Sequence, residues 1–265
     1  METIGYIASA LVGVVMGLIG GGGSILTIPI LVYLFALSPT LAISYSLFIV
    51  GFTSLVGAIN NVTKGLVNLK TAGIFGSSSI TTVFLSRKFI IPFLPDVFFR
   101  IRGFEVTHAI FVMVMFALLM LVASLSMIKH DPKNVKPRTK EKPAILILFG
   151  VLIGLVTGFL GAGGGFLLIP ALVLLMNLPM KEAIGTSLFI VALNSLIGFI
   201  GDIGRHPIDW RFISIITAIA VAGIFIGGYF NQFIESDKLK RGFGWFVLVA
   251  GIFILIKELY AINQH

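Results

Sequence analysis

The chain has 265 residues, of which 57% are hydrophobic and 11% are charged, and its formal net charge is +8. Soluble domains carry about 25% charged residues, and one core in a chain of this length could not bury so much apolar surface. The composition therefore excludes an ordinary soluble enzyme, a secreted disulfide scaffold and a disordered chain, and it predicts a polytopic membrane protein.

Apolar stretches follow one another along the chain, and each predicts a helix, because a strand in lipid would expose its backbone polar groups. Most of them have, or nearly have, the length of about 20 residues that a full span needs. Two pairs are shorter, and a glycine cluster interrupts each pair. The stretches cover residues 4–19, 25–37, 41–60, 66–85, 106–128, 144–160, 166–178, 183–201, 208–230 and 243–259.

A polar segment, Lys129–Lys142, divides the chain near its middle. It contains six Lys or Arg and two Pro, and almost no apolar residue. This composition is typical of a linker, and its positive charge predicts a cytoplasmic position. We therefore expect a first membrane repeat at 1–128, a basic cytoplasmic linker at 129–143 and a second membrane repeat at 144–265.

The two halves repeat each other at a constant separation of 141 positions. Gly20 matches Gly161, and the run Ser46–Val50 recurs letter for letter as Ser187–Val191. Glycine and serine rarely coincide by chance in one register over so long a stretch, so the halves are interpreted as internal repeats. Repeated membrane halves are typical of transporters, which bind their substrate near the midplane beside discontinuous helices.

The relative orientation of the halves depends on how the interrupted pairs cross the membrane. A re-entrant hairpin or two full spans gives each half an odd number of crossings and hence inverted repeats, whereas one broken span gives parallel repeats. In the odd-number arrangements twelve Lys and Arg lie on the linker side and seven, including Arg87, lie on the other side. This asymmetry favours inverted repeats. The predicted fold is thus all-α and polytopic, with a glycine-broken short helix pair and three long helices in each half.

The glycine clusters are the main candidates for a binding site. Glycine leaves room for a ligand, adopts positive φ and exposes N–H groups at the start of the next helix, where an anion is favoured. Close helix packing through small residues is the alternative. The predicted substrate-binding turns consist of Gly20, Gly21, Gly22, Gly23 and Ser24 in the first half and of Gly161, Ala162, Gly163, Gly164 and Gly165 in the second.

Polar side chains on the long third helices are expected to complete this site. Ser46, Ser187 and Asn194 are the candidates, because an amide in hydrocarbon needs hydrogen-bond partners. For the serines, a bond to the backbone of their own helix is the alternative. We expect no intramembrane Arg or Lys that could pair with an anion, which leaves backbone N–H groups as the donors.

Charged residues at helix ends are candidates for coupling or gating. Asp202 is the acid nearest to an apolar span, and Lys70 and Arg211 are matched cations at the head of the fourth helix of each half. A solvated helix end or an anchor at the interface is the alternative for each. The sequence has no cysteine and no cluster of metal-ligating residues, and we predict neither a metal, a cofactor nor an enzyme.

The sequence resembles the TauE/SafE permeases, the sulfite and organosulfonate exporter group. The resemblance covers about 4–259 and is carried by Gly17–Ser24 with Pro29, by Gly158–Phe166 with Pro170, and by Ala183–Ser187. It implies a secondary transporter, an exporter of a small sulfur-containing anion, in the cytoplasmic membrane and without a bound cofactor. One branch of the family imports thiosulfate through membrane cysteines, which this chain does not have.

The predicted function is therefore anion transport by alternating access. The expected partners are a small anionic substrate, a coupling proton or ion, and membrane lipid, with no nucleic acid; the oligomeric state is left open. An anion channel on the same scaffold and a membrane-embedded enzyme or assembly subunit are the alternatives. A channel would conduct far faster than a carrier turns over, and an enzyme would convert its substrate in detergent.

Overall fold

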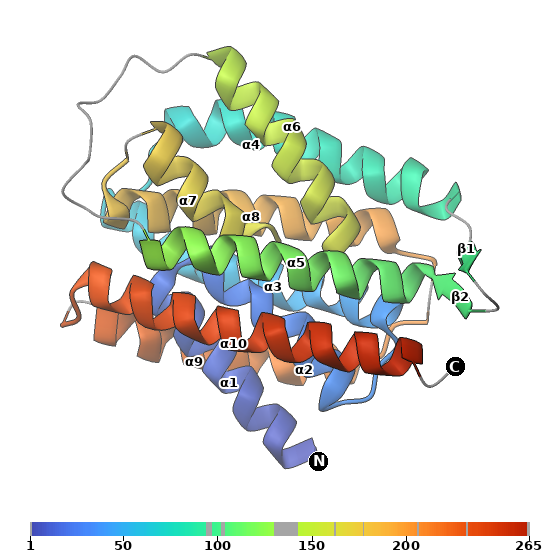
Figure 1. The fold of residues 1–265 in the computed structure, drawn as a ribbon. Helices are drawn as coiled ribbons and strands as arrows, with labels where there is room; N and C mark the ends of the chain where they lie inside the picture. The colour runs from blue at the N-terminus through green and yellow to red at the C-terminus, as the bar shows by residue number, and fades with distance from the viewer. Residues whose placement is uncertain are drawn as a thin grey trace.

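The computed structural model describes residues 2–93, 97–101, 104–129, 143–161, 163–176, 178–205, 207–231 and 233–263. Nearly all of the predicted linker at 129–143 lies outside them, as does Ala162 of the second glycine cluster. Within these ranges the chain forms ten α-helices; most of them run roughly along one direction, and α1, α6 and α7 are inclined to it (Figure 1). The predicted helical class is confirmed.

Helices form where the apolar stretches were found. The first half contains α1 (Glu2–Ile19), η1 (Gly21–Leu26), α2 (Thr27–Tyr33), α3 (Pro39–Thr63), α4 (Leu69–Leu85), η2 (Ser86–Ile90), η3 (Ile91–Phe93) and α5 (His108–Lys129). The second contains α6 (Pro143–Leu160), α7 (Gly165–Met176), α8 (Met180–Asp202), α9 (Trp210–Asn231) and α10 (Ser236–Asn263). Ser38 caps α3 and Asn68 caps α4, since each side chain accepts a hydrogen bond from a backbone N–H three residues on.

One segment departs from the all-α expectation. Between α4 and α5 the chain forms two short antiparallel strands, β1 (Val97–Ile101) and β2 (Phe104–Thr107). This segment lies between two apolar stretches and mixes aromatic and β-branched residues with charged ones. Such a composition favours a hairpin outside the hydrocarbon, where water can bond the strand edges.

The helices differ in how deeply they are buried. By length and apolar composition α3, α6, α8 and α9 could each cross a membrane. Of these, α3 and α8 are mostly buried and form the centre of the molecule, whereas α6 and α9 are largely exposed. Large apolar side chains such as Leu148 and Phe225 point outward. This arrangement is what a surface in contact with lipid requires.

The first glycine-interrupted pair folds back on itself. Gly5 near the start of α1 packs against the ring of Phe35, which follows α2, and the rings of Tyr6 and Phe35 lie 5.5 Å apart. In the second pair a Cβ on Gly164 would lie 3.3 Å from Ile153 Cγ2, eleven positions earlier in the chain. With 12 residues, α7 is about 18 Å long, too short for a hydrocarbon core of about 30 Å. The pairs are therefore hairpins whose second member is short.

Matched positions of the two halves make matched contacts with the opposite half. Gly13 of α1 lies against the backbone of Ala220 in α9, and Gly154 of α6 lies against the backbone of Ser79 in α4. Gly13 and Gly154 are 141 positions apart, and so are Ser79 and Ala220, so the repeat relates the two contacts to each other. Small residues allow both helix pairs to approach closely.

The helices α3 and α8, which pack antiparallel, also make contacts at matched positions of the two halves. Gly57 of α3 faces Leu188 of α8, and Gly198 of α8 faces Leu47 of α3. Because contacts advance along one helix as they retreat along the other, the two helices run in opposite directions. The two halves thus meet along a buried seam that α3 and α8 share.

Two hydrogen bonds at opposite ends of this seam are related in the same way. The N–H of Asn68 donates to Thr186 Oγ1 over 2.9 Å, and the N–H of Asp209 donates to the hydroxyl of Tyr45 over 2.8 Å. The loop before α4 is thus tied to α8 of the other half, and the loop before α9 is tied to α3. Both bonds satisfy a backbone donor outside regular secondary structure.

Candidate functional site

The two glycine turns meet in the buried centre of the molecule. A Cβ on Gly21 would lie 2.9 Å from Gly165 Cα and 2.9 Å from Val191 Cγ2. A Cβ on Gly165 would likewise clash with the backbone of Gly21. Neither position could carry a side chain without separating the two turns. Gly21 and Gly165, which belong to different predicted turns and are far apart in the sequence, therefore lie in direct contact.

The first turn is a compact 3-10 turn. Gly20 adopts φ +83°, and the space of its missing Cβ is taken by Ile184 of α8. The residues Gly21, Gly22, Gly23 and Ser24 that follow are all buried. Ser24 donates its hydroxyl to the carbonyl of Gly21 over 2.7 Å, which closes the turn on itself. Gly23 packs against Met16 in α1 and so serves the packing of the hairpin.

The second turn is more open in its backbone and more polar in its surroundings. Gly161, Gly163 and Gly164 have φ values of +65°, +65° and +69°, a region that favours glycine. Gly161 faces Ile43 of α3, as Gly20 faces the matched Ile184 of α8. Ser46 Oγ lies 2.6 Å from the carbonyl oxygen of Gly161 and 2.8 Å from that of Ile43 in its own helix, so its single proton is donated to one of them or shared between both.

Buried polar atoms without a partner surround the second turn. A Cβ on Gly163 would lie 2.8 Å from Ser195 Oγ, and one on Gly164 would meet Thr157 Oγ1. Both side chains are at most 1% exposed, and neither oxygen has a hydrogen-bond partner within the described ranges. Buried polar groups are nearly always hydrogen-bonded in native structures. These hydroxyls are therefore available to a ligand or to water.

The polar candidates on α3 and α8 all lie in this buried region. Ser187 donates to the carbonyl of Ile184 in its own helix, and its Oγ would lie 3.6 Å from a Cβ on Gly21. Asn194 donates to Ser79 Oγ over 2.7 Å, while its Oδ1 has no partner among the described residues. Ser46, Ser187 and Asn194 are each 0% exposed.

The expectation that no buried cation is available to an anion is wrong. The apolar stretch ends at residue 85, and Arg87 was placed in the following loop. In the structure α4 continues into η2, a π-helical turn that directs Arg87 inward, where it is 2% exposed. There its Cβ lies against Gly201 of α8, since a Cβ on that glycine would be 3.0 Å away. Hydropathy alone cannot detect a cation that the turn after a helix carries inward.

Arg87 belongs to a buried charge cluster with Asp202 and Arg205. Arg87 Nη1 lies 2.9 Å from Asp202 Oδ2, and Arg205 Nη1 lies 3.1 Å from Asp202 Oδ1. Ser44 also donates its hydroxyl to Asp202 Oδ2, over 2.5 Å. The alternative assignment of Asp202 to a solvated helix end is therefore wrong, because its side chain is 2% exposed.

A cavity opens at the other end of α3 and α8, and we call it the vestibule. Its volume is about 290 Å³, and it carries two lysines and three amide side chains. Ile184, which fills the space beside Gly20, also lines the vestibule, so that the cavity reaches the first glycine turn. The vestibule residues are Gly17, Asn60, Asn61, Lys64, Leu66, Lys181, Ile184, Gly228 and Asn231.

The vestibule and the charge cluster occupy matched positions at opposite ends of the molecule. The separation of 141 positions converts Asn61 into Asp202, Lys64 into Arg205, and Arg87 into Gly228. In Figure 1 α3 ends and α8 begins at the left, the vestibule end, whereas α4 and α8 end at the right, beside the hairpin of β1 and β2. Positions that the repeat relates therefore line an open cavity at one end of the molecule and form a buried ion pair at the other.

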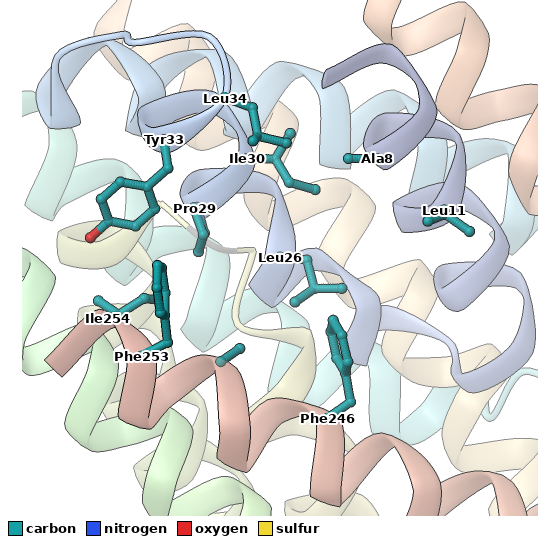
Figure 2. A pocket seen from close by; sticks show the side chains of 11 residues that line it. Ala8, Leu11, Leu26, Pro29, Ile30, Tyr33, Leu34, Phe246, Phe253 and Ile254 are labelled. Carbon is teal, nitrogen blue, oxygen red and sulfur yellow. The ribbon is translucent and has the colours of Figure 1, made fainter. Parts of the chain in front are cut away.

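A second cavity is apolar and does not suit an anion. It has a volume of about 280 Å³ and lies between α1, α2 and α10, where carbon atoms of residues such as Leu26, Phe246 and Phe253 line it (Figure 2). Its polar group, the hydroxyl of Tyr33, donates to Glu258 Oε1 over 2.9 Å. An acyl chain fits such a surface better than an anion does.

The remaining predicted residues are on the surface. Lys70 and Arg211 are exposed in the first turns of α4 and α9, and neither lines the vestibule. No group of three or more His, Asp or Glu that could hold a metal ion occurs in the part of the chain that the structure describes. The glycine turns, their polar neighbours, the vestibule and the charge cluster therefore make up the candidate site.

The sequence matches the family described as sulfite exporter TauE/SafE over residues 6–254, nearly the whole chain. The chain belongs to the TauE/SafE family. It is 29% identical over 262 residues to a probable membrane transporter protein of Xylella fastidiosa strain Temecula1, a match that covers 96% of this chain and 94% of that protein. It is also 27% identical over 248 residues to YunE of Bacillus subtilis strain 168, a probable membrane transporter protein, with 86% and 87% covered.

No solved structure gave a significant match. The family and the names of the relatives agree with the resemblance that the glycine motifs carry, and they identify a membrane transporter of the TauE/SafE group. Relatives that are named as transporters are consistent with a protein that is not an enzyme.

Proposed function

We propose that this TauE/SafE protein is a secondary transporter that exports a small sulfur-containing anion, such as sulfite or an organosulfonate, across the cytoplasmic membrane by alternating access. One observation carries the proposal: the two glycine turns meet at the buried centre, with an open cationic vestibule at one end and a closed charge cluster at the matched position of the other. Alternating access requires such a centre, reached from one side at a time.

We also propose that the two halves are inverted repeats. Contacts such as Gly57 with Leu188 and Leu47 with Gly198 exchange the two halves, as a two-fold rotation does. Because α3 and α8 run antiparallel across this seam, an axis that exchanges them lies perpendicular to the helices, that is, in the membrane plane. With one hairpin and three long helices in each half, the number of crossings is odd, which agrees with such an inversion.

The proposed substrate site lies between the turns Gly20–Ser24 and Gly161–Gly165. Backbone N–H groups would bind the anion's oxygens, and Ser46, Ser187 and Asn194 would complete the shell, together with the unpartnered hydroxyl of Ser195. Charge-assisted bonds from backbone N–H groups give affinity without a permanent ion pair, so that the anion can also leave.

The vestibule is proposed to face the cytoplasm. It lies at the end where α5 ends and α10 begins, which is also the end from which the basic linker departs. Lys64 and Lys181 would raise the local concentration of anions at its mouth. A proton or another ion is the proposed coupling partner, and no cofactor is needed.

Ligand-dependent thermal stability of the purified protein tests the substrate class. Sulfite, thiosulfate, sulfate, sulfoacetate, taurine and a carboxylate would be compared at equal ionic strength, since a ligand that binds the folded state raises its stability. We expect the sulfur oxyanions to raise the unfolding temperature in a saturable manner. An equal response to all of these compounds and to chloride would contradict the proposed selectivity.

An anion channel on the same scaffold is disfavoured by the closed end. A channel needs a path that is open at both ends at once, whereas buried Arg87 and Asp202 fill one end. Voltage-driven conductance far above the turnover of a carrier would support the channel. Conversion of the substrate in detergent would support a membrane-embedded enzyme instead.

A further inference from the structure

Buried Arg87 has donors that the protein itself leaves unused. Its side chain is only 3% exposed. Nη1 pairs with Asp202, but Nε and Nη2 have no hydrogen-bond partner within the described ranges. A buried guanidinium with unpaired donors costs free energy that only a ligand or water can recover. The location of these donors therefore indicates where a ligand belongs.

The unused donors lie on one edge of the guanidinium. Nε–H and one N–H of Nη2 point in the same direction, and together they match the two oxygens of a carboxylate, sulfite or phosphate. Asp202 occupies the other side through Nη1. Arg87 can therefore hold its carboxylate partner and an oxyanion at the same time.

The unused edge lies at the second glycine turn. A Cβ on Gly161 would be 2.8 Å from Arg87 Nη2 and 3.0 Å from the carbonyl oxygen of Ile43. Glycine at this position thus allows the guanidinium to reach the turn. Ser46, whose hydroxyl lies within hydrogen-bond distance of the carbonyl of Gly161, holds the turn from the other side.

The charge balance of the cluster also calls for an anion. Arg87 and Arg205 carry two positive charges against the single negative charge of Asp202, and Ser44 adds no charge. Arg205 is 26% exposed and therefore partly hydrated, whereas Arg87 is not. A monoanion on the free edge would neutralise the cluster, and buried charges are stable only when they are paired.

We propose that the Nε–Nη2 edge of Arg87 is a binding site for a small oxyanion, at the end of the pathway opposite the vestibule, and that the ion pair with Asp202 keeps this end closed while the site is empty. The proposal rests on the proposed function and extends it to a second site. At the matched position the vestibule has Gly228 and Asn61 in place of the ion pair. This difference explains why that end is open.

The replacement Arg87→Lys tests the site, with Lys88→Gln as its matched control. Lysine keeps the charge but loses the planar fork, whereas exposed Lys88 is the adjacent cation and contributes no group to the site. Sulfite binding would be measured by calorimetry on purified protein with wild-type elution and helix content. We expect Arg87→Lys to weaken binding about tenfold to a hundredfold and Lys88→Gln to leave it unchanged.

A second variant keeps the test decisive if Arg87→Lys fails to fold. Asp202→Asn removes the negative charge beside Arg87 and leaves the Nε–Nη2 edge in place, so we expect it to bind sulfite more tightly than the wild type. Unchanged sulfite affinity in the folded Arg87→Lys protein, or in Asp202→Asn, would overturn the proposal. If the wild type binds neither sulfite nor any other small oxyanion, the proposed function itself fails, and the two failures are thereby distinguished.

Discussion

At the scale of single residues, the glycines of the two turns have different tasks. Gly21 and Gly165 allow two backbones to touch, and Gly23 allows a hairpin to close. Gly163 instead combines positive φ with a position where its missing Cβ leaves room beside Ser195 Oγ, which has no hydrogen-bond partner among the described residues. The sequence could predict that glycine clusters matter, because their composition exceeds what packing needs. It could not predict which glycine packs and which faces a ligand, because that depends on the opposite half.

The replacement Gly163→Val should abolish anion binding between the two glycine turns. Valine cannot adopt φ +65° cheaply, and its Cβ would meet Ser195 Oγ, Val191 and Val50 at 2.8–2.9 Å. We expect a loss of stability on the order of 3 kcal/mol. The control is Gly73→Val, since that helical glycine has open space around its missing Cβ. Unfolding and sulfite binding would be measured on both, and a folded Gly163→Val protein with wild-type affinity would show that the turn serves packing only.

The matched serines Ser46 and Ser187 should respond differently to alanine. Both hydroxyls lie within hydrogen-bond distance of a carbonyl of their own helix, Ile43 for Ser46 and Ile184 for Ser187, but Ser46 also reaches the turn carbonyl of Gly161 in the other half. Loss of the bond to Gly161 leaves a buried carbonyl unpaired, so we expect Ser46→Ala to cost about 1–3 kcal/mol and Ser187→Ala less than about 1 kcal/mol. Chemical denaturation in detergent would measure both values, and equal costs would show that the bond across the halves contributes nothing.

At the scale of elements, the apolar stretches and the repeat predicted the helices well, because a segment that is apolar on all sides can satisfy its backbone hydrogen bonds in lipid by forming a helix. The hairpin of the first pair follows from a contact between Gly5 and Phe35, which no local pattern encodes. Three elements were not predicted. β1 lies outside the apolar stretches, β2 overlaps the start of the stretch 106–128 that was predicted as helix, and η2 extends α4 past the point where its hydropathy ends. For this reason Asp202 was recognised as a candidate but its partners Arg87 and Ser44 were not.

The linker is expected to tolerate insertion. A protease site placed near Lys136 should leave transport intact, because the segment is polar, basic and rich in proline and has no apolar face to bury. In intact cells the site should be cleaved only from the cytoplasmic side. Cleavage by a protease added outside would contradict the proposed orientation and, with it, the cytoplasmic position of the vestibule.

At the scale of the whole molecule, the exchange of contacts between the halves is the most informative feature. The same repeat builds both ends of the seam, yet Asn61 and Gly228 leave one end open, while Asp202 and Arg87 close the other. The repeat was evident from the sequence. The difference between its ends was not, because the vestibule combines residues of α1, α3, α8 and α9, and the charge cluster combines residues of α3, η2 and α8 with Arg205.

The two ends should differ in their access to thiol reagents. The chain has no cysteine, so single variants report without a background. Asn60→Cys in the vestibule should react quickly with a charged reagent, whereas Ser44→Cys beside Asp202 should react slowly, since Ser44 is 6% exposed. Adding Asp202→Asn should accelerate labelling at position 44, because it removes the ion pair. Fast labelling of Ser44→Cys without that change would show that the cluster does not close the pathway.

Counterflow of radiolabelled sulfite in proteoliposomes tests the central claim, anion transport by alternating access, most directly. Vesicles preloaded with unlabelled sulfite should take up the label in a saturable exchange that is faster than uptake into empty vesicles, and Gly163→Val should abolish it. This acceleration arises only when a carrier returns loaded to the other side. If the wild type moves sulfite and the other tested anions no faster than protein-free vesicles, or moves them without stimulation by internal sulfite, the protein is not the carrier described here.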